Sequence, residues 1–94
     1  MAEDSTLKKK NRDKFEVWYD MLKVLADGGL GKTRIMHMAI LSFDQLKEHL
    51  TALDKLQLIT NDGDGMIYLS DKGEAFMKKY ERLCKIFDTR KIEN

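Results

Sequence analysis

Two helical segments in the middle of the chain are separated by only three residues, Ile40, Leu41 and Ser42. Residues 33–39 carry apolar side chains at helical spacing, and a second helix begins after Ser42. The Ser42 hydroxyl can accept a hydrogen bond from the backbone three residues on, while Gln45 reaches back, which is the S-x-x-Q capping box. A connection this short forces the two helices to cross sharply. The sequence therefore predicts a helix-turn-helix whose second helix extends to about Leu56.

The helix predicted before this pair covers residues 15–27. Phe15, Trp18, Leu22 and Leu25 recur at steps of three and four, as on the buried face of an amphipathic helix. Gly28 follows it, and glycine adopts the left-handed conformation of a helix C-cap without steric cost. We therefore expect the apolar face of this helix, which includes Trp18, to lie in the core.

A hairpin and a long helix are predicted to follow. Residues 58–60 and 66–69 are short β-rich runs on either side of two Asp-Gly pairs, the pattern of a β-hairpin. Ser70 then caps a helix that is expected to run from Asp71 toward Arg90. Its apolar residues are spaced four, three and four apart, as in a coiled-coil seam. The seam consists of Phe76, Tyr80, Leu83 and Phe87.

This order of elements predicts a winged helix-turn-helix of the α+β class, in which three helices carry a two-stranded wing and a long C-terminal helix follows. With 94 residues, of which 43% are hydrophobic, the chain is expected to form one core. We divide it into a basic N-terminal arm (1–14), the winged domain (15–70) and a dimerisation helix (71–94).

Several function classes are disfavoured by what the chain lacks. A single cysteine, Cys84, allows no internal disulfide and no Cys-rich zinc site, and no apolar run approaches the ~20 residues that span a bilayer. His37 and His49 stand on different elements without clustered carboxylates, so no metal site is expected. No nucleophile–base or paired-carboxylate pattern is present either. We expect a cytoplasmic, non-enzymatic protein with no cofactor, no membrane association and no small-molecule ligand.

Two loop patterns resemble ligand sites but fail in detail. The stretch from Gly28 to Thr33 ends in Gly-Lys-Thr, yet a phosphate-binding loop requires glycine where Ala26 stands and a strand before it. The two Asp-Gly pairs lack the later oxygen ligands of a calcium loop, whose positions hold Met66 and Gly73. Both stretches are interpreted as turns.

Two short sequence motifs resemble those of a known family. They are Lys-Thr-Arg-Ile-Met at 32–36 and Tyr-Leu-Ser-Asp-Lys-Gly at 68–73, and between them lie Gln45-Leu46 and Leu58-Ile59. Over residues 15–90 the chain resembles the small archaeal winged-helix DNA-binding proteins, which include chromosomal proteins and transcriptional regulators. That resemblance implies double-stranded DNA as partner, a nucleoid-associated location, residues 42–55 as the recognition helix and a homodimer joined through the last helix by an antiparallel coiled coil.

The charge distribution limits which residues are expected to meet DNA. Residues 42–70 carry a net charge of −3, so the phosphate contacts are expected from cations elsewhere. The candidates for DNA contact are Lys8, Lys9, Lys10, Lys32, Thr33, Arg34, Ser42, Gln45, Lys47, His49 and Thr51. The arm lysines are equally compatible with a solubilising role, and Gln45 with capping alone. The acidic recognition helix leaves a second hypothesis open, a winged helix that binds another protein and not DNA.

Overall fold

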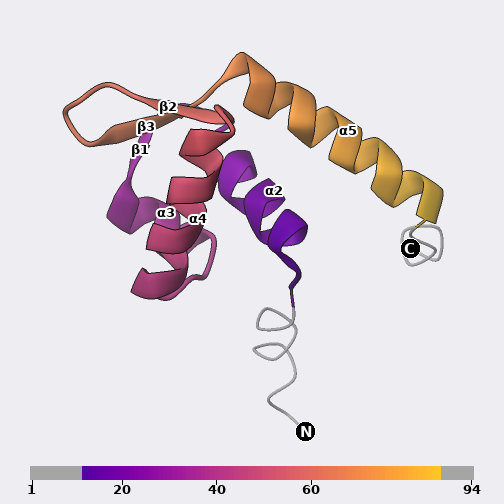
Figure 1. The fold of residues 1–94 in the computed structure, drawn as a ribbon, viewed down its shortest axis with the longest axis horizontal. Helices are drawn as coiled ribbons and strands as arrows, with labels where there is room; N and C mark the ends of the chain where they lie inside the picture. Colours follow the sequence, from indigo (N-terminus) through magenta and orange to yellow (C-terminus); the bar gives the residue numbers. More distant parts are fainter. Residues whose placement is uncertain (1–11, 88–94) are drawn as a thin grey trace, which may run out of the picture.

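The computed structural model describes residues 12–87, which form a winged helix (Figure 1). The elements are α2 (Lys14–Val24), β1 (Leu30–Gly31), α3 (Lys32–Met38), α4 (Phe43–Lys55), β2 (Ile59–Asn61), β3 (Met66–Leu69) and α5 (Asp71–Phe87). The predicted α+β winged helix-turn-helix is thereby confirmed. The predicted extension of the last helix toward Arg90 lies outside the described residues.

Helix α2 is shorter at its C-terminal end than the sequence pattern predicted. It begins after Asp13, whose side chain accepts a hydrogen bond from the Glu16 backbone at 2.7 Å, and it ends at Val24. Leu25 is the C-cap, and its N–H donates to the carbonyl of Leu22, which tightens the last turn. Gly28 does adopt a positive φ of 142°, but it lies in the turn beyond the helix. The prediction of a glycine C-cap was therefore wrong.

The helix-turn-helix forms as predicted, including its capping box. The Ser42 hydroxyl accepts from the Gln45 N–H at 3.1 Å, and the Gln45 side chain accepts from the Ser42 N–H at 2.9 Å. Before it, α3 ends in a Schellman motif, in which the Leu41 N–H donates to the carbonyl of Met36 at 3.0 Å. Ile40 occupies the left-handed position of this motif, with φ at 58°.

Replacing Ile40 with glycine should stabilise the protein. A β-branched residue in the left-handed region costs about 1–2 kcal/mol, whereas the Ile40 side chain is 54% exposed and contributes little burial. Glycine removes most of this cost from the folded state. Part of the gain in stability is offset because glycine makes the unfolded chain more flexible. We expect the free energy of unfolding to rise by about 1 kcal/mol in urea denaturation. Ile40→Ala keeps the Cβ and should bring no comparable gain.

The wing belongs to a three-stranded antiparallel sheet in the order β1-β3-β2, and not to the two-stranded hairpin predicted. The third strand is Leu30–Gly31, which pairs with Ile67 and Met66. Leu30 and Gly31 directly precede α3, and two residues are too few to show the alternating pattern of a strand. They become a strand because the fold brings their backbone beside β3, where it completes the ladder.

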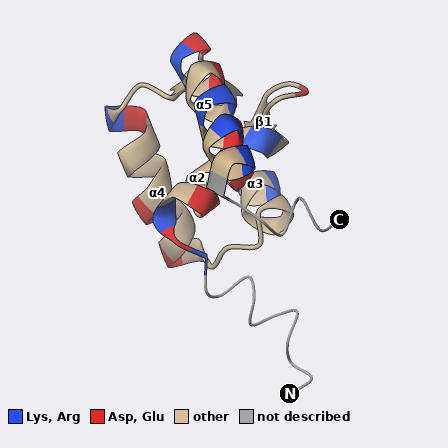
Figure 2. Cartoon of the chain, turned by 90° about the vertical axis from the view of Figure 1, so that its right-hand side faces the viewer, with Lys and Arg blue, Asp and Glu red and all other residues tan. Residues whose placement is uncertain are grey.

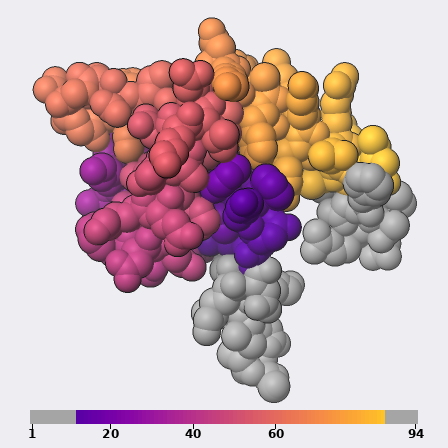
Figure 3. Space-filling view, viewed as in Figure 1, coloured from indigo at the N-terminus to yellow at the C-terminus, as the bar shows by residue number. Residues whose placement is uncertain are grey.

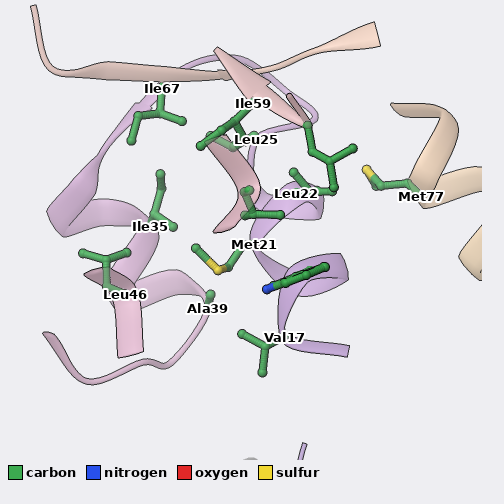
Figure 4. Close-up of a cluster of buried hydrophobic side chains, with 13 residues drawn as sticks. Val17, Met21, Leu22, Leu25, Ile35, Ala39, Leu46, Ile59, Ile67 and Met77 are labelled. Carbon is green, nitrogen blue, oxygen red and sulfur yellow. The ribbon is translucent and has the colours of Figure 1, made fainter. Parts of the chain in front are cut away.

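The core lies between α2, the helix-turn-helix and the inner face of the sheet (Figure 4). Each of these elements contributes, as the labelled side chains of Met21, Ile35, Leu46 and Ile67 illustrate. Trp18 is only 7% exposed, which confirms its predicted place in the core. Burying such side chains contributes roughly 1.5–3 kcal/mol each before entropic costs. The core therefore fixes the orientation of α4 relative to the wing.

Helix α5 begins in close contact with the backbone of Leu58, the residue just before β2. The Ser70 hydroxyl caps it by accepting from the Gly73 N–H at 2.9 Å, and the Ser70 N–H donates to the carbonyl of Leu58. A Cβ on Gly73 would overlap that same Leu58 oxygen. Glycine is therefore required at position 73 by close packing of helix against backbone.

The first half of α5 packs on α2 through aromatic rings. Tyr19 and Tyr80 stack at a centroid distance of 5.0 Å, and Phe76 lies 6.4 Å from Trp18. The Tyr19 hydroxyl donates to the Glu81 carboxylate at 2.6 Å. Two of the four predicted seam residues, Phe76 and Tyr80, are thus engaged within the chain itself.

This packing favours the neutral tyrosine side chains. Burial and the bond to Glu81 raise the pKa of Tyr19 from 10.0 to about 12, and burial, with nearby Cys84, also raises the pKa of Tyr80. A group whose pKa is raised on folding stabilises the fold fully below its unfolded value. The contribution of both tyrosines is therefore complete at neutral pH and is lost progressively above pH 10.

Candidate nucleic-acid interface

A groove of about 440 Å³ lies between the start of α3, the exposed side of α4 and the sheet. Its apolar lining consists of Leu46, Leu50, Ile59 and Ile67. Its polar and aromatic lining consists of Lys32, Phe43, Lys47, Thr51, Asp54 and Asn61. Three of the residues predicted to meet DNA, namely Lys32, Lys47 and Thr51, are thus brought together from two helices.

One stripe of α4 faces this groove. Phe43, Lys47 and Thr51 are four residues apart, a spacing that aligns side chains along one helix face. The Lys47 ammonium lies 5.4 Å from the centre of the Phe43 ring, and the Thr51 hydroxyl donates to the carbonyl of Lys47 at 2.9 Å. All three residues are exposed. The stripe is therefore available to a partner that approaches the groove.

The acidic residues of α4 are mostly separated from this stripe. Asp44 and Glu48 each follow a stripe residue by one position, which at 3.6 residues per turn rotates them by about 100° around the helix. Neither lines the groove, whereas Asp54 does. The net negative charge of residues 42–70 is therefore not spread evenly over α4. Within the stripe of Phe43, Lys47 and Thr51, the charge is the positive charge of Lys47 alone.

Four other predicted contact residues, Thr33, Arg34, Ser42 and Gln45, are exposed but do not line the groove. Thr33 and Arg34 are exposed on the first turn of α3. Ser42 and Gln45 are exposed as well, but their side chains hold the capping box together. The predicted contacts Lys8, Lys9 and Lys10 lie outside the described residues.

His49 lies on the side of α4 that faces α2. Its Nδ1 accepts a hydrogen bond from the indole N–H of Trp18 at 3.0 Å. Nδ1 can accept this bond only because it carries no proton. The bond holds the imidazole and the Trp18 ring in a fixed relative orientation. Only the remaining edge of the ring is left for any contact with a partner.

Two residues that sequence reasoning did not single out have clear roles here. Phe43 is 61% exposed at the first position of α4, where it lines the groove. Arg12 donates to Asp20 at 2.6 Å and to the carbonyl of Ile40 at 2.8 Å, with its side chain only 5% exposed. It ties the start of α2 to the turn of the helix-turn-helix. Its partners are 8 and 28 residues away, so no local pattern signals it.

The remaining residues of the predicted dimer seam lie on the outer half of α5. Leu83 is 50% exposed, and beside it Ile86 is 71% exposed. The side chain of Phe87 lies outside the part of the chain that the structure describes. Basic and acidic residues alternate along this helix in Figure 2, and the space-filling view shows α5 extending beyond the other elements (Figure 3). The outer half of α5 thus combines charged residues with exposed apolar ones.

No three His, Cys, Asp or Glu side chains within residues 12–87 are grouped to hold a metal ion. None of the helices described is both long and apolar enough to cross a membrane.

A three-helix core, a sharp turn before an exposed α4 and a wing beside it define the winged-helix class of domains. Residues 11–87 match the sequence profile of a winged helix-turn-helix family, and the chain belongs to that family. The family resemblance predicted from the two sequence motifs is confirmed in this respect.

Two similar proteins come from archaea. The chain is 30% identical over 82 residues to the uncharacterized protein MJ0290 of Methanocaldococcus jannaschii, covering 87% of this chain but only 38% of that protein's length. The fold also resembles that of Sso10a-2, described as a DNA-binding protein from Sulfolobus solfataricus. That likeness has a TM-score of 0.71 with 22% identity, over 87% of this chain and 88% of the other.

Proposed function

We propose that this protein binds double-stranded DNA, with α4 as the recognition helix and the groove beside the wing facing the duplex. The observation that carries the proposal is the meeting of Lys32, Lys47 and Thr51 around one exposed face of α4. The fold shared with Sso10a-2, which is described as DNA-binding, supports it.

The mechanism divides the work between two sets of residues. The cations of α3, Lys32 and Arg34, contact phosphates and set the position of the domain, and the arm lysines Lys8–Lys10 add to that charge. Lys47 and Thr51 on α4 meet base edges or sugars in the major groove. Ser42, Gln45 and His49 contribute less, because each is already committed to a hydrogen bond within the chain.

A titration of labelled random duplex at several salt concentrations tests this proposal. Each neutralised phosphate releases counterions, so the logarithm of the binding constant should fall linearly with the logarithm of salt concentration, with a slope of about −0.9 per contact. We expect a slope of about −2 or steeper per domain. Absence of binding at low salt would refute the proposal.

The second part of the proposal is a homodimer joined through α5, which functions as a transcriptional regulator or chromosome-associated factor. Phosphate contacts from one domain are few, so two domains on one duplex raise the affinity. The exposed apolar side chains of Leu83 and Ile86 support α5 as the contact. A helix of 17 residues is about 25 Å long, which is about three quarters of one DNA turn of roughly 34 Å.

Replacing Leu83 with aspartate is expected to convert the dimer to a monomer. A charge at this half-exposed position costs little in the single chain but several kcal/mol in an apolar interface. Sedimentation equilibrium measures the mass. Lys85→Asp places a carboxylate about 200° around α5 from Leu83, on the opposite face, without removing an apolar side chain, and should leave the dimer intact. A wild-type monomer, or an unchanged dimer in Leu83→Asp, would contradict this assignment.

A second function is favoured by one observation, the outward-facing carboxylates Asp44 and Glu48 on α4. They suit a basic protein partner better than they suit DNA. In that case the salt titration shows no binding to DNA, and the exposed face of α4 engages another polypeptide.

A further inference from the structure

Phe43 is exposed in a way that the fold itself does not require. It is the first residue of α4, and 61% of it is accessible, whereas the core side of the same helix is formed by Leu46 and Leu53. The capping box is complete without it, since Ser42 and Gln45 bond to each other's backbone. An aromatic residue also has a lower helix propensity than the residues usual at exposed positions. The ring at this end of α4 is therefore available for contact with a partner.

The surroundings of the ring indicate the charge of that partner. Phe43 lines the groove together with Lys32 and Lys47, and the Lys47 ammonium lies 5.4 Å from the ring centre. The apolar ring is thus accompanied by cations from two helices. A partner that combines closely spaced negative charge with a small apolar group fits this arrangement.

We propose that Phe43 is a specificity-determining residue that contacts the C5-methyl group of a thymine in the major groove. The inference rests on the proposed DNA binding and deepens it. The first residues of a recognition helix are those that reach base edges, and thymine alone among the four bases presents a methyl group there. A phenyl ring cannot accept or donate the hydrogen bonds of the other base edges. Lys32 meets a phosphate, and Lys47, which lies beside the ring, meets a base edge or sugar, so that the ring is held against the base.

The experiment begins with selection of preferred sites from random duplexes by the wild-type protein. Each thymine of the selected site is then replaced singly by uracil, which removes only the methyl group. Burial of one methyl corresponds to about a four-fold change in affinity. We expect one uracil position per half-site to weaken wild-type binding by about four-fold. For Phe43→Ala, the thymine and uracil duplexes should bind equally at that position.

Two control variants separate this role from general effects. Phe43→Leu keeps an apolar contact and should retain part of the preference for thymine. Phe15→Ala removes another half-exposed aromatic ring, on α2, and should retain all of it. Thermal unfolding of each variant establishes that it is folded.

The outcomes distinguish the inference from the function on which it rests. If wild-type protein binds duplex with the expected salt dependence but shows no selected preference, or no uracil position weakens binding, the role of Phe43 is refuted and DNA binding stands. The same holds if Phe43→Ala keeps the discrimination, as expected for a ring that docks on another protein. If duplex is not bound at low salt, both proposals fail.

Discussion

Replacing Gly73 with alanine is expected to destabilise the protein by about 3 kcal/mol. Helix propensity alone would predict the opposite, because alanine in a helix is favoured over glycine by about 1 kcal/mol. The packing around Gly73 determines that the free energy of unfolding falls. The new Cβ would overlap the backbone oxygen of Leu58 and lie 2.8 Å from Cδ1 of Leu69. Overpacking against backbone usually costs about 1–3 kcal/mol and at times more, since the Leu58 backbone cannot rotate away as a side chain can.

Urea unfolding followed by circular dichroism measures this effect, and Gly31→Ala is the matched control. Gly31 has an ordinary φ of −80°, and the nearest atom to its added Cβ is 3.9 Å away. We expect Gly31→Ala to stay within about 1 kcal/mol of the wild type, because a slightly poorer N-cap is offset by a stiffer unfolded chain. Equal stability of Gly73→Ala and wild type would show that α5 does not seat on Leu58 as described.

The second large effect is a loss of DNA affinity, which is expected when Lys32 and Arg34 are both replaced with alanine. If each contacts one phosphate, the log–log salt slope becomes shallower by about 1.8. Because phosphates carry no sequence information, affinity should fall alike for preferred and random duplexes. This uniform loss contrasts with Phe43→Ala, whose effect depends on the base at one position.

Lys79→Ala combined with Lys85→Ala is the matched control, since it removes the same charge from α5, away from the groove. It should change the slope much less than the α3 double variant. Equal losses in both would mean that binding follows overall charge and has no defined face. A loss confined to one preferred site would contradict the phosphate role of Lys32 and Arg34.

The groove gives a reason why an acidic recognition segment remains compatible with DNA binding. In the sequence, Lys47 stands between Asp44 and Glu48, and the three charges sum to −1. On the helix, Lys47 shares its face with Phe43 and Thr51, and Lys32 joins them from α3. The distribution of charge around α4, and not its sum, is the relevant quantity for a partner at this face.

Local patterns in the sequence determined the elements and their order. The spacing of apolar residues in α2 and α4, the Ser42–Gln45 capping box and the Ser70 cap all involve residues within a few positions of one another. Such interactions join neighbours along the chain, so the sequence displays them directly.

Only the tertiary structure decided what depends on residues distant in sequence. The third strand forms because β3 supplies a partner, Arg12 reaches the carbonyl of Ile40 across 28 positions, and Phe76 and Tyr80 pack on α2. The candidate site belongs to the same category, since α3, α4 and the sheet meet only after the core has formed. Periodicity reports which face of an element is apolar, but it carries no information on which distant surface that face will meet.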